Sequence, residues 1–236
     1  MNVHSLFFVI FIGLSATLPV RDEILWADSL DIAQPVTFNN LLYLRDMRYT
    51  TIYIRAFDTY RYTNFDKTMA ETIQNAYNNY YHVELYMTPN AYTLTTGADQ
   101  VQRLYNGLKD NEIPIDKLWI NVTTTQAWLT NTTANIVLID SALNRARQLG
   151  FTKIGIFTSA NEWTKITGDW KNAGNDVRLW YWCNNGDGKS NESPRSFDDF
   201  VPFGNWTQAD VKQYGVKEIL SNTLVNRDIY VLQRNP

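Results

Sequence analysis

Residues 117–159 read KLWINVTTTQAWLTNTTANIVLIDSALNRARQLGFTKIGIFTS and contain the pattern that decides the fold. An apolar run from Lys117 to Val122 is typical of a buried strand. It is followed by an amphipathic helical stretch, Ala134 to Leu149, which ends at Gly150. A second strand-like run, Lys153 to Ser159, completes the unit. A strand, a helix and a strand in this order indicate a parallel βαβ unit.

The same alternation extends along the rest of the chain. Residues with strand character occupy 24–29, 49–57, 83–87, 178–183, 211–215 and 229–232, and helical spacing occurs over 37–47, 66–80, 97–111 and 161–168. Eight strands in about 210 residues predict a single-domain α/β fold, a modified TIM-type (β/α) barrel with shortened helices near its end. The alternative is an open doubly wound sheet, which normally has a Gly-rich turn after its first strand. Residues 27–30 read ADSL, which is not such a turn.

The first twenty residues, MNVHSLFFVIFIGLSATLPV, resemble a secretory leader. The apolar run from Leu6 to Leu14 is too short to cross a bilayer of about 30 Å as a helix, and small residues follow it. We therefore expect residues 1–18 to be a signal peptide and 19–236 to be one secreted domain. A hydrophobic anchor is the alternative, since the leader lacks Lys and Arg.

Composition excludes several classes of protein. The net charge is −3, which argues against nucleic-acid binding because that function favours a basic face. No second apolar run approaches membrane length, so we expect no membrane partner and a monomer. Cys183 is the one cysteine, and in an oxidising compartment its thiol has to be buried or paired between chains; burial is the expected arrangement. With His4 and His82 as the sole histidines, no metal-site spacing occurs, and we expect no cofactor.

Four N-glycosylation sequons support passage through the secretory pathway, although chance alone yields one or two. Asn131, Asn191 and Asn205 are the candidate glycosylation sites. Asn121 also begins a sequon, but it lies inside a predicted strand, and we expect it to be unmodified.

Function in a parallel barrel lies at the carboxyl ends of the strands. The predicted ends carry polar or aromatic side chains. Residues two apart on a strand point to the same face, so Asn121 shares a face with Thr123, and Trp180 with Trp182. Asp28 is charged within an apolar strand, and a satisfied structural carboxylate is the alternative to a catalytic role. Glu162 is the second residue of a short predicted helix, and we expect it to be a surface acid whose negative charge compensates the helix dipole.

The order of these segments resembles glycoside hydrolase family 25, the muramidase-type lysozymes, and especially their nematode branch. The segments that carry the resemblance cover the whole predicted domain in order: 26–29 (WADS), 54–57 (IRAF), 86–89 (YMTP), 118–123 (LWINVT), 153–158 (KIGIFT), 179–182 (LWYW), 197–206 (FDDFVPFGNW) and 212–214 (KQY). The resemblance implies a secreted barrel that binds peptidoglycan and cleaves the β-1,4 bond after N-acetylmuramic acid.

Carried over to this sequence, the family's catalytic acids are mostly missing. The first acid is assigned to Asp28. The Asp-x-Glu pair falls on Asn121 and Thr123, and the late Asp falls on Asn226. Glycoside hydrolysis needs a proton donor and a carboxylate across the bond, and neither an amide nor a hydroxyl replaces them. The chain also has fewer cysteines than is usual in the nematode branch.

Binding could persist without catalysis. The resemblance places aromatic and polar candidates for glycan contact around the cleft: Arg55, Glu84, Tyr86, Trp180, Trp182 and Tyr214. For the two tryptophans, core packing is an equal alternative. We therefore expect a peptidoglycan-directed, lysozyme-like protein with impaired or absent catalysis, in defence or digestion. The alternatives are a lysozyme of low activity and an interaction protein that binds no glycan.

Overall fold

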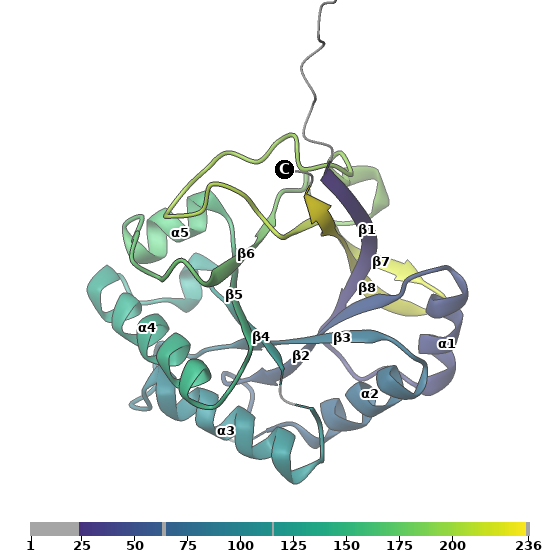
Figure 1. Cartoon of the computed structure of the whole chain (residues 1–236), viewed down its shortest axis with the longest axis horizontal. Coiled ribbons are helices and arrows are strands. Elements are labelled where there is room, and N and C mark those ends of the chain that lie inside the picture. The colour runs from purple at the N-terminus through teal and green to yellow at the C-terminus, as the bar shows by residue number, and fades with distance from the viewer. Residues whose placement is uncertain (1–23, 63–64, 115, 235–236) are drawn as a thin grey trace, which may run out of the picture.

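Eight strands form a closed ring with five α-helices outside it in the computed structural model, which describes residues 24–62, 65–114 and 116–234 (Figure 1). The strands are β1 (Ile24–Ile32), β2 (Thr51–Asp58), β3 (His82–Thr88), β4 (Lys117–Asn121), β5 (Lys153–Thr158), β6 (Val177–Trp182), β7 (Val211–Leu220) and β8 (Thr223–Arg234). The helices are α1 (Phe38–Asp46), α2 (Lys67–Asn78), α3 (Gly97–Asp110), α4 (Thr132–Gln148) and α5 (Ala160–Thr167), with 3₁₀ turns η1 (Thr125–Ala127) and η2 (Lys189–Asn191). The predicted α/β barrel is confirmed.

The barrel departs from a fully parallel arrangement at β8. Strands β1 to β7 are parallel to their neighbours, whereas β8 runs antiparallel to both β7 and β1. The connection from β7 to β8 is a two-residue turn, Ser221 and Asn222, and both residues have positive φ, 45° and 60°. A two-residue turn of this kind can join only antiparallel strands. Because β8 is reversed, its first residues lie at the carboxyl edge of the other strands.

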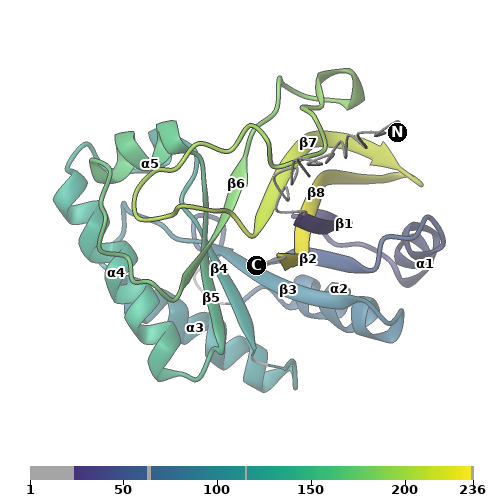
Figure 2. The ribbon, with the colours of Figure 1, turned by 45° about the horizontal axis from the view of Figure 1, so that its top comes forward.

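The helices cover only part of the ring. Helices α1 to α5 lie outside β1 to β6. A long loop, residues 183–210, crosses the side of the ring that runs from β6 through β7 and β8 to β1 (Figures 1 and 2). Within the described ranges no helix has the length and hydropathy needed to cross a bilayer. The predicted signal peptide, residues 1–18, lies outside the described residues.

Two apolar regions hold the barrel together. The larger one lies between strands and helices and includes Leu30, Ile120 and Leu143, all fully buried. The second fills the barrel interior with the side chains of Tyr53, Tyr86, Trp119, Phe157, Trp180 and Val211. The ring of Trp180 is central, because it lies within 4.1–5.8 Å, centroid to centroid, of four other aromatic rings. This interior is a packed core, so a ligand that contacts the strand ends has to bind above it, at the barrel mouth.

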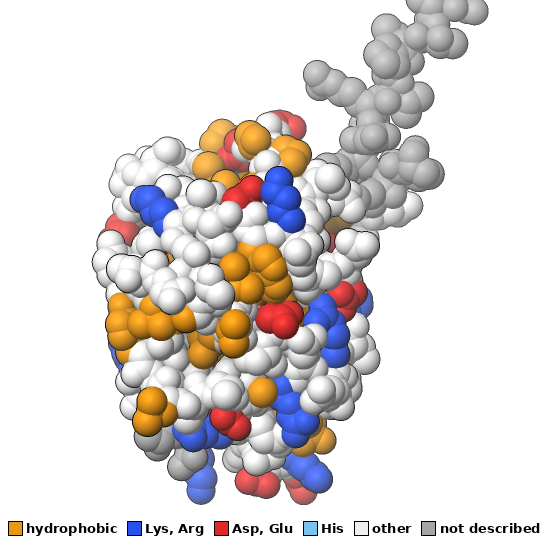
Figure 3. Space-filling model, turned by 90° about the vertical axis from the view of Figure 1, so that its left-hand side faces the viewer, with side chains coloured by type: hydrophobic (Ala, Val, Ile, Leu, Met, Phe, Trp, Pro, Cys, Tyr) orange, Lys and Arg blue, Asp and Glu red, His pale blue; other side chains and the backbone are white. Residues whose placement is uncertain are grey.

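On the face formed by α4 and α5, apolar side chains form small patches separated by polar and charged ones (Figure 3). Patches of this kind are ordinary for a folded domain.

Candidate functional site

The carboxyl edge of the barrel brings one buried acid together with two amides. Asp31, at the end of β1, is 2% exposed. Its two carboxylate oxygens each accept a hydrogen bond of 3.1 Å from Asn226 Nδ2 on β8. Gln213 Nε2 donates to Asp31 Oδ2 at 2.5 Å, and the hydroxyl of Tyr86 donates to Oδ1 at 3.3 Å. Three side chains therefore fix the orientation of this carboxyl group.

Burial changes the acidity of Asp31. Desolvation raises the pKa of its carboxyl from 3.8 to about 6, although the hydrogen bonds from Asn226, Gln213 and Tyr86 act in the opposite direction. Asp228, two residues after Asn226 and fully buried, has a pKa raised well above its ordinary value by desolvation and by the charge of Asp31. Its Oδ1 accepts a 3.0 Å hydrogen bond from the indole of Trp180. The site thus contains acidic groups that retain protons at unusually high pH.

Asp28 does not occupy the position assigned to it from the sequence. Its half-buried side chain shares the outward face of β1 with Leu30 and Ile32, because alternate residues point to opposite faces. Asp28 accepts a 2.6 Å bond from Arg195 Nε and a second bond from the same guanidinium, which also lies 4.7 Å from the ring centre of Trp26. Asp28 therefore attaches the 183–210 loop to β1, and the inward-facing acid at the mouth is Asp31.

Asn121 and Thr123 lie at the mouth as predicted from the sequence. The Thr123 hydroxyl donates to Asn121 Oδ1 at 2.7 Å, and Asn121 Nδ2 donates to the Thr88 hydroxyl at 3.2 Å. Both residues line a pocket of about 210 Å³ together with Asp58, Arg61 and other residues of the β2–α2 and β4–α4 connections. The pocket carboxylate of Asp58 is already paired, since Arg55 Nη1 and Arg61 Nε each lie 3.4 Å from its Oδ2.

Glu162 is a buried residue of the mouth and not the surface acid expected from the sequence. It is 8% exposed and sits in the first turn of α5. Its Oε1 accepts a 2.5 Å bond from the backbone N–H of Thr124, and its Oε2 accepts a 2.7 Å bond from the indole of Trp182. This carboxylate therefore connects the β4–α4 loop to the end of β6. Sequence reasoning missed the role because only the fold brings these three segments together.

The predicted glycan contacts divide into accessible and inaccessible groups. Trp182 is half-buried at the mouth, and Arg55 is half-buried with its Nη2 donating to Ala33 O at 2.8 Å. Trp180 is fully buried in the interior cluster, and Tyr86 is 5% exposed within it. The two tryptophans thus share a face but not an environment.

Two further candidates lie away from the mouth. Glu84 is buried near the start of β3, where it accepts a 2.7 Å bond from the indole of Trp119 and pairs with Lys117 at 3.1 Å. Tyr214 is 1% exposed, and the Arg227 guanidinium lies 5.1 Å from the centre of its ring. Neither side chain can reach a ligand at the mouth.

The sequons differ in accessibility. Asn131 is exposed and caps α4 by accepting a bond from Ala134 N. Asn191 and Asn205 are half-buried, and their amides donate to the carbonyls of Asp187 and Gly174. Glycosylation at these three positions stays a prediction.

Cys183 is half-buried rather than enclosed, and burial raises the pKa of its thiol. No group of three His, Cys, Asp or Glu side chains within the described part of the chain could hold a metal ion.

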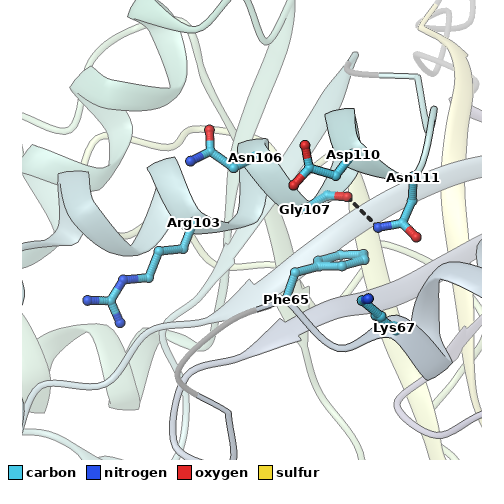
Figure 4. Close-up of a pocket in the computed structure, with 7 residues that line it drawn as sticks. All are labelled: Phe65, Lys67, Arg103, Asn106, Gly107, Asp110 and Asn111. Carbon is cyan, nitrogen blue, oxygen red and sulfur yellow. Dashed lines mark hydrogen bonds between the residues drawn. The ribbon is translucent and has the colours of Figure 1, made fainter.

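A second pocket, of about 400 Å³, lies outside the barrel and against α3 (Figure 4). Its lining residues are Phe65, Lys67, Arg103, Asn106, Gly107, Asp110 and Asn111. None of them belongs to the strand ends, so this pocket is separate from the mouth.

Comparison with known proteins identifies relatives of the same architecture. The family model described as Lysozyme-like protein 1 matches residues 22–214. Lysozyme-like protein 1 of Caenorhabditis elegans is 38% identical over 90% of this chain and 71% of its own length. Probable GH family 25 lysozyme 5 of Dictyostelium discoideum is 28% identical over 78% of this chain and 82% of its own. A family GH25 lysozyme from Aspergillus fumigatus superposes with a TM-score of 0.65 at 16% identity, covering 87% of this chain and 94% of its own.

Proposed function

The chain belongs to the GH25-type lysozyme family, and from that premise we propose that it is a secreted, peptidoglycan-directed protein that binds glycan at the barrel mouth without efficient catalysis. The family membership supports a polysaccharide ligand. The hydrogen-bonded pair of Asn121 and Thr123 at the end of β4 is the observation that carries the loss of catalysis.

The chemistry of glycoside hydrolysis explains why an amide and a hydroxyl at these two positions matter. The reaction needs one group that protonates the leaving oxygen and a second carboxylate across the bond. Asn121 and Thr123 offer neither at neutral pH. General acid catalysis contributes about 10²–10⁴-fold, so its loss removes at least that factor from the rate.

Two other acids at the mouth, Asp58 and Glu162, are held by structural contacts. The carboxylate of Asp58 is paired with two guanidinium groups, and that of Glu162 accepts two N–H bonds. Both carboxylates are therefore already bonded to neighbouring groups of the protein.

A lysozyme of low activity is the second candidate, and Asp31 favours it. With a pKa raised to about 6, this carboxyl is protonated in part of the molecules near neutral pH and could act as an acid. It would have to work without the Asp-x-Glu pair.

One experiment with two readouts separates these functions. Release of soluble fragments from purified bacterial cell walls is compared for the wild type and Asp31→Ala, with Asp28→Ala as the matched control. We expect no turnover above Asp31→Ala and clear retention on insoluble peptidoglycan in a pull-down. Turnover that Asp31→Ala removes and Asp28→Ala leaves intact would establish the low-activity enzyme. Absence of both turnover and retention would favour an interaction protein.

Secretion, a role in defence or digestion, and the monomeric state belong to the same proposal. The apolar leader and the sequons support secretion. N-terminal sequencing of protein recovered from the medium tests it, and we expect a new terminus near residue 19.

A further inference from the structure

The four sequons of the chain are equivalent as sequence motifs, but the folded structure gives their side chains different surroundings. In each of them a sugar would be attached to Nδ2 of the Asn, and a Ser or Thr hydroxyl stands two residues later. The attached glycan is bulky and hydrated, so it has to lie at the surface. A sequon that the fold tolerates as a modification site therefore has an exposed Asn, an Nδ2 that the protein does not use, and an accessible hydroxyl residue.

Asn131 meets all three requirements. Its side chain is exposed, and so is that of Thr133, the hydroxyl residue of its sequon. Asn131 Oδ1 accepts a hydrogen bond of 3.1 Å from Ala134 N, whereas Nδ2 donates to no group within the part of the chain that the structure describes. A hydrogen on Nδ2 can therefore be replaced by a sugar without loss of a contact inside the protein.

A sugar on Asn131 also leaves the start of α4 intact. Asn131 is the N-cap of this helix, and it caps through Oδ1 and not through Nδ2. An amide oxygen keeps its lone pairs when the nitrogen of the same amide carries a substituent, so the oxygen still accepts the bond from Ala134 N. The stabilising contact of the N-cap is thus compatible with the modification.

At the other three sequons the fold uses the atom that would carry the sugar. All three Asn side chains are half-buried. Their Nδ2 atoms donate as follows: Asn121 to the Thr88 hydroxyl at 3.2 Å, Asn191 to Asp187 O at 2.8 Å, and Asn205 to Gly174 O at 3.2 Å. A glycan at any of these positions would have to occupy space that the protein fills.

Further contacts of these sequons point the same way. The Thr123 hydroxyl donates to Asn121 Oδ1 at 2.7 Å, so both ends of that sequon are bound to each other. Ser193, which completes the sequon of Asn191, is 7% exposed, and its hydroxyl donates to Cys183 O at 2.5 Å. Asn205 Oδ1 is buried and has no partner among the described residues, which shows that this amide is turned into the protein.

From these contrasts we propose that Asn131 carries an N-linked glycan in the folded protein and that Asn121, Asn191 and Asn205 do not. The proposal rests on secretion, which is part of the proposed function, because the sugar donor belongs to the secretory pathway. That donor is an oligosaccharide joined through a diphosphate to a lipid. The transfer forms a bond between Asn131 Nδ2 and C1 of the first sugar and breaks the bond between C1 and the diphosphate oxygen. The lipid diphosphate leaves with the electron pair of the broken bond, and the amide releases one proton.

The order of events does not remove the selectivity. The transferase also meets unfolded chain, in which every sequon is accessible. A chain that is modified at a half-buried Asn then has to fold with that amide displaced, and its former partners lose a hydrogen bond. The folded product should therefore carry its glycan at Asn131.

Glycopeptide mass spectrometry of the full chain, expressed with its leader in a secreting eukaryotic cell, tests the proposal. In folded protein from the medium, we expect a glycan at Asn131 and unmodified Asn at the other three sequons. Thr133→Ser keeps the sequon and should keep the glycan, whereas Thr133→Ala should abolish it. Asn131→Asp should also abolish it while it retains an oxygen for Ala134 N, so loss of the glycan is separated from loss of the cap.

Thr207→Ala is the matched control. Thr207 is exposed and completes the sequon of Asn205, so its replacement should leave the mass of the glycoprotein unchanged apart from the substitution itself. Circular dichroism before and after enzymatic removal of the glycan, and of each variant, establishes that the proteins compared are folded.

The possible outcomes are distinct. A glycan at Asn131 that Thr133→Ala removes and Thr207→Ala leaves in place supports the proposal. Folded protein from the medium without a glycan at Asn131, or with one at Asn121, Asn191 or Asn205, overturns it and leaves secretion standing. A chain that stays inside the cell and carries no glycan refutes secretion and, with it, the glycan at Asn131.

Discussion

The carboxyl of Asp31 should make the protein less stable as the pH rises, and Asp31→Asn should remove that loss. In the folded state its pKa is about 6, against an ordinary value of 3.8. The folded protein therefore retains a proton that the unfolded chain releases. The stabilisation is fully present below about pH 3.8 and is lost as the pH rises to about 6.

The magnitude follows from the two pKa values. At about 1.4 kcal/mol per pKa unit, the ionisation of Asp31 costs about 3 kcal/mol of folding free energy at pH 7 and above. The neighbouring buried carboxyl of Asp228 acts in the same direction. Asn at position 31 has the same shape without the charge, but it loses one acceptor for Gln213 or Asn226, at a cost of about 1 kcal/mol. The net gain at pH 7.5 is about 2 kcal/mol.

Denaturant unfolding of wild type and Asp31→Asn at several pH values between 4 and 8 measures this difference. The two proteins should be of similar stability near pH 4, and the variant should be more stable by about 2 kcal/mol at pH 7.5. Asp28→Asn is the control, because the half-buried ion pair of Asp28 with Arg195 is near the surface and contributes about 1 kcal/mol at all the pH values compared. An Asp31→Asn variant that is less stable than wild type at pH 7.5, with the pH dependence unchanged, would refute the reasoning.

Three further results are expected. Burial and the nearby Glu192 raise the pKa of Glu218 to about 7, so the folded protein loses stability as the pH rises from about 4.5 to 7. Glu218→Gln should reduce this loss, and thermal melting temperatures of both proteins across that pH range measure the difference. Trp180→Ala should destabilise the fold by about 3–5 kcal/mol in denaturant titrations, and a loss under 1 kcal/mol would mean that the interior is not packed as described. Asn121→Asp combined with Thr123→Glu should produce cell-wall turnover where the wild type has none, provided that the rest of the mouth is intact.

The strand pattern of the sequence predicts the eight strands of the barrel but not the antiparallel hairpin that completes it. The βαβ unit from 117 to 159 predicts parallel strands, and β4, α4 and β5 follow it closely. The segments 211–215 and 229–232 were expected as two short strands, whereas β7 and β8 form a long hairpin. The residues between them hold the turn signal, Ser221 and Asn222, but neither is a glycine, and their positive φ angles depend on the hairpin around them.

The acid of the first strand shows where residue-level prediction failed. The sequence pattern predicts a strand that ends at Ser29, which makes Asp28 the acid at its carboxyl end. The strand in fact continues through Leu30, Asp31 and Ile32, and its alternation places Leu30 and Ile32 outward and Asp31 inward. The signal was present, since an acid between two large apolar residues is typical of a strand with one polar face. The partner of Asp28 could not be predicted, because Arg195 lies 167 residues away in a loop without periodicity.

The amides at the mouth also have a consequence for stability. Asn226 donates to both oxygens of Asp31 at 3.1 Å, where a carboxylate in its place would repel it. Two carboxylates at such a distance cannot both ionise readily, and the pKa of one of them rises strongly. An acid at position 226 would therefore add to the free-energy cost of folding that Asp31 and Asp228 already impose.

An active site that needs several acids keeps this electrostatic repulsion, because activity and stability trade off against each other. Under the proposed loss of catalysis, an amide in place of an acid at position 226 stabilises the fold and keeps a polar group beside Asp31. Asn226→Asp tests this directly: we expect lower stability at pH 7.5 and little change near pH 4, and equal stability at both pH values would contradict it.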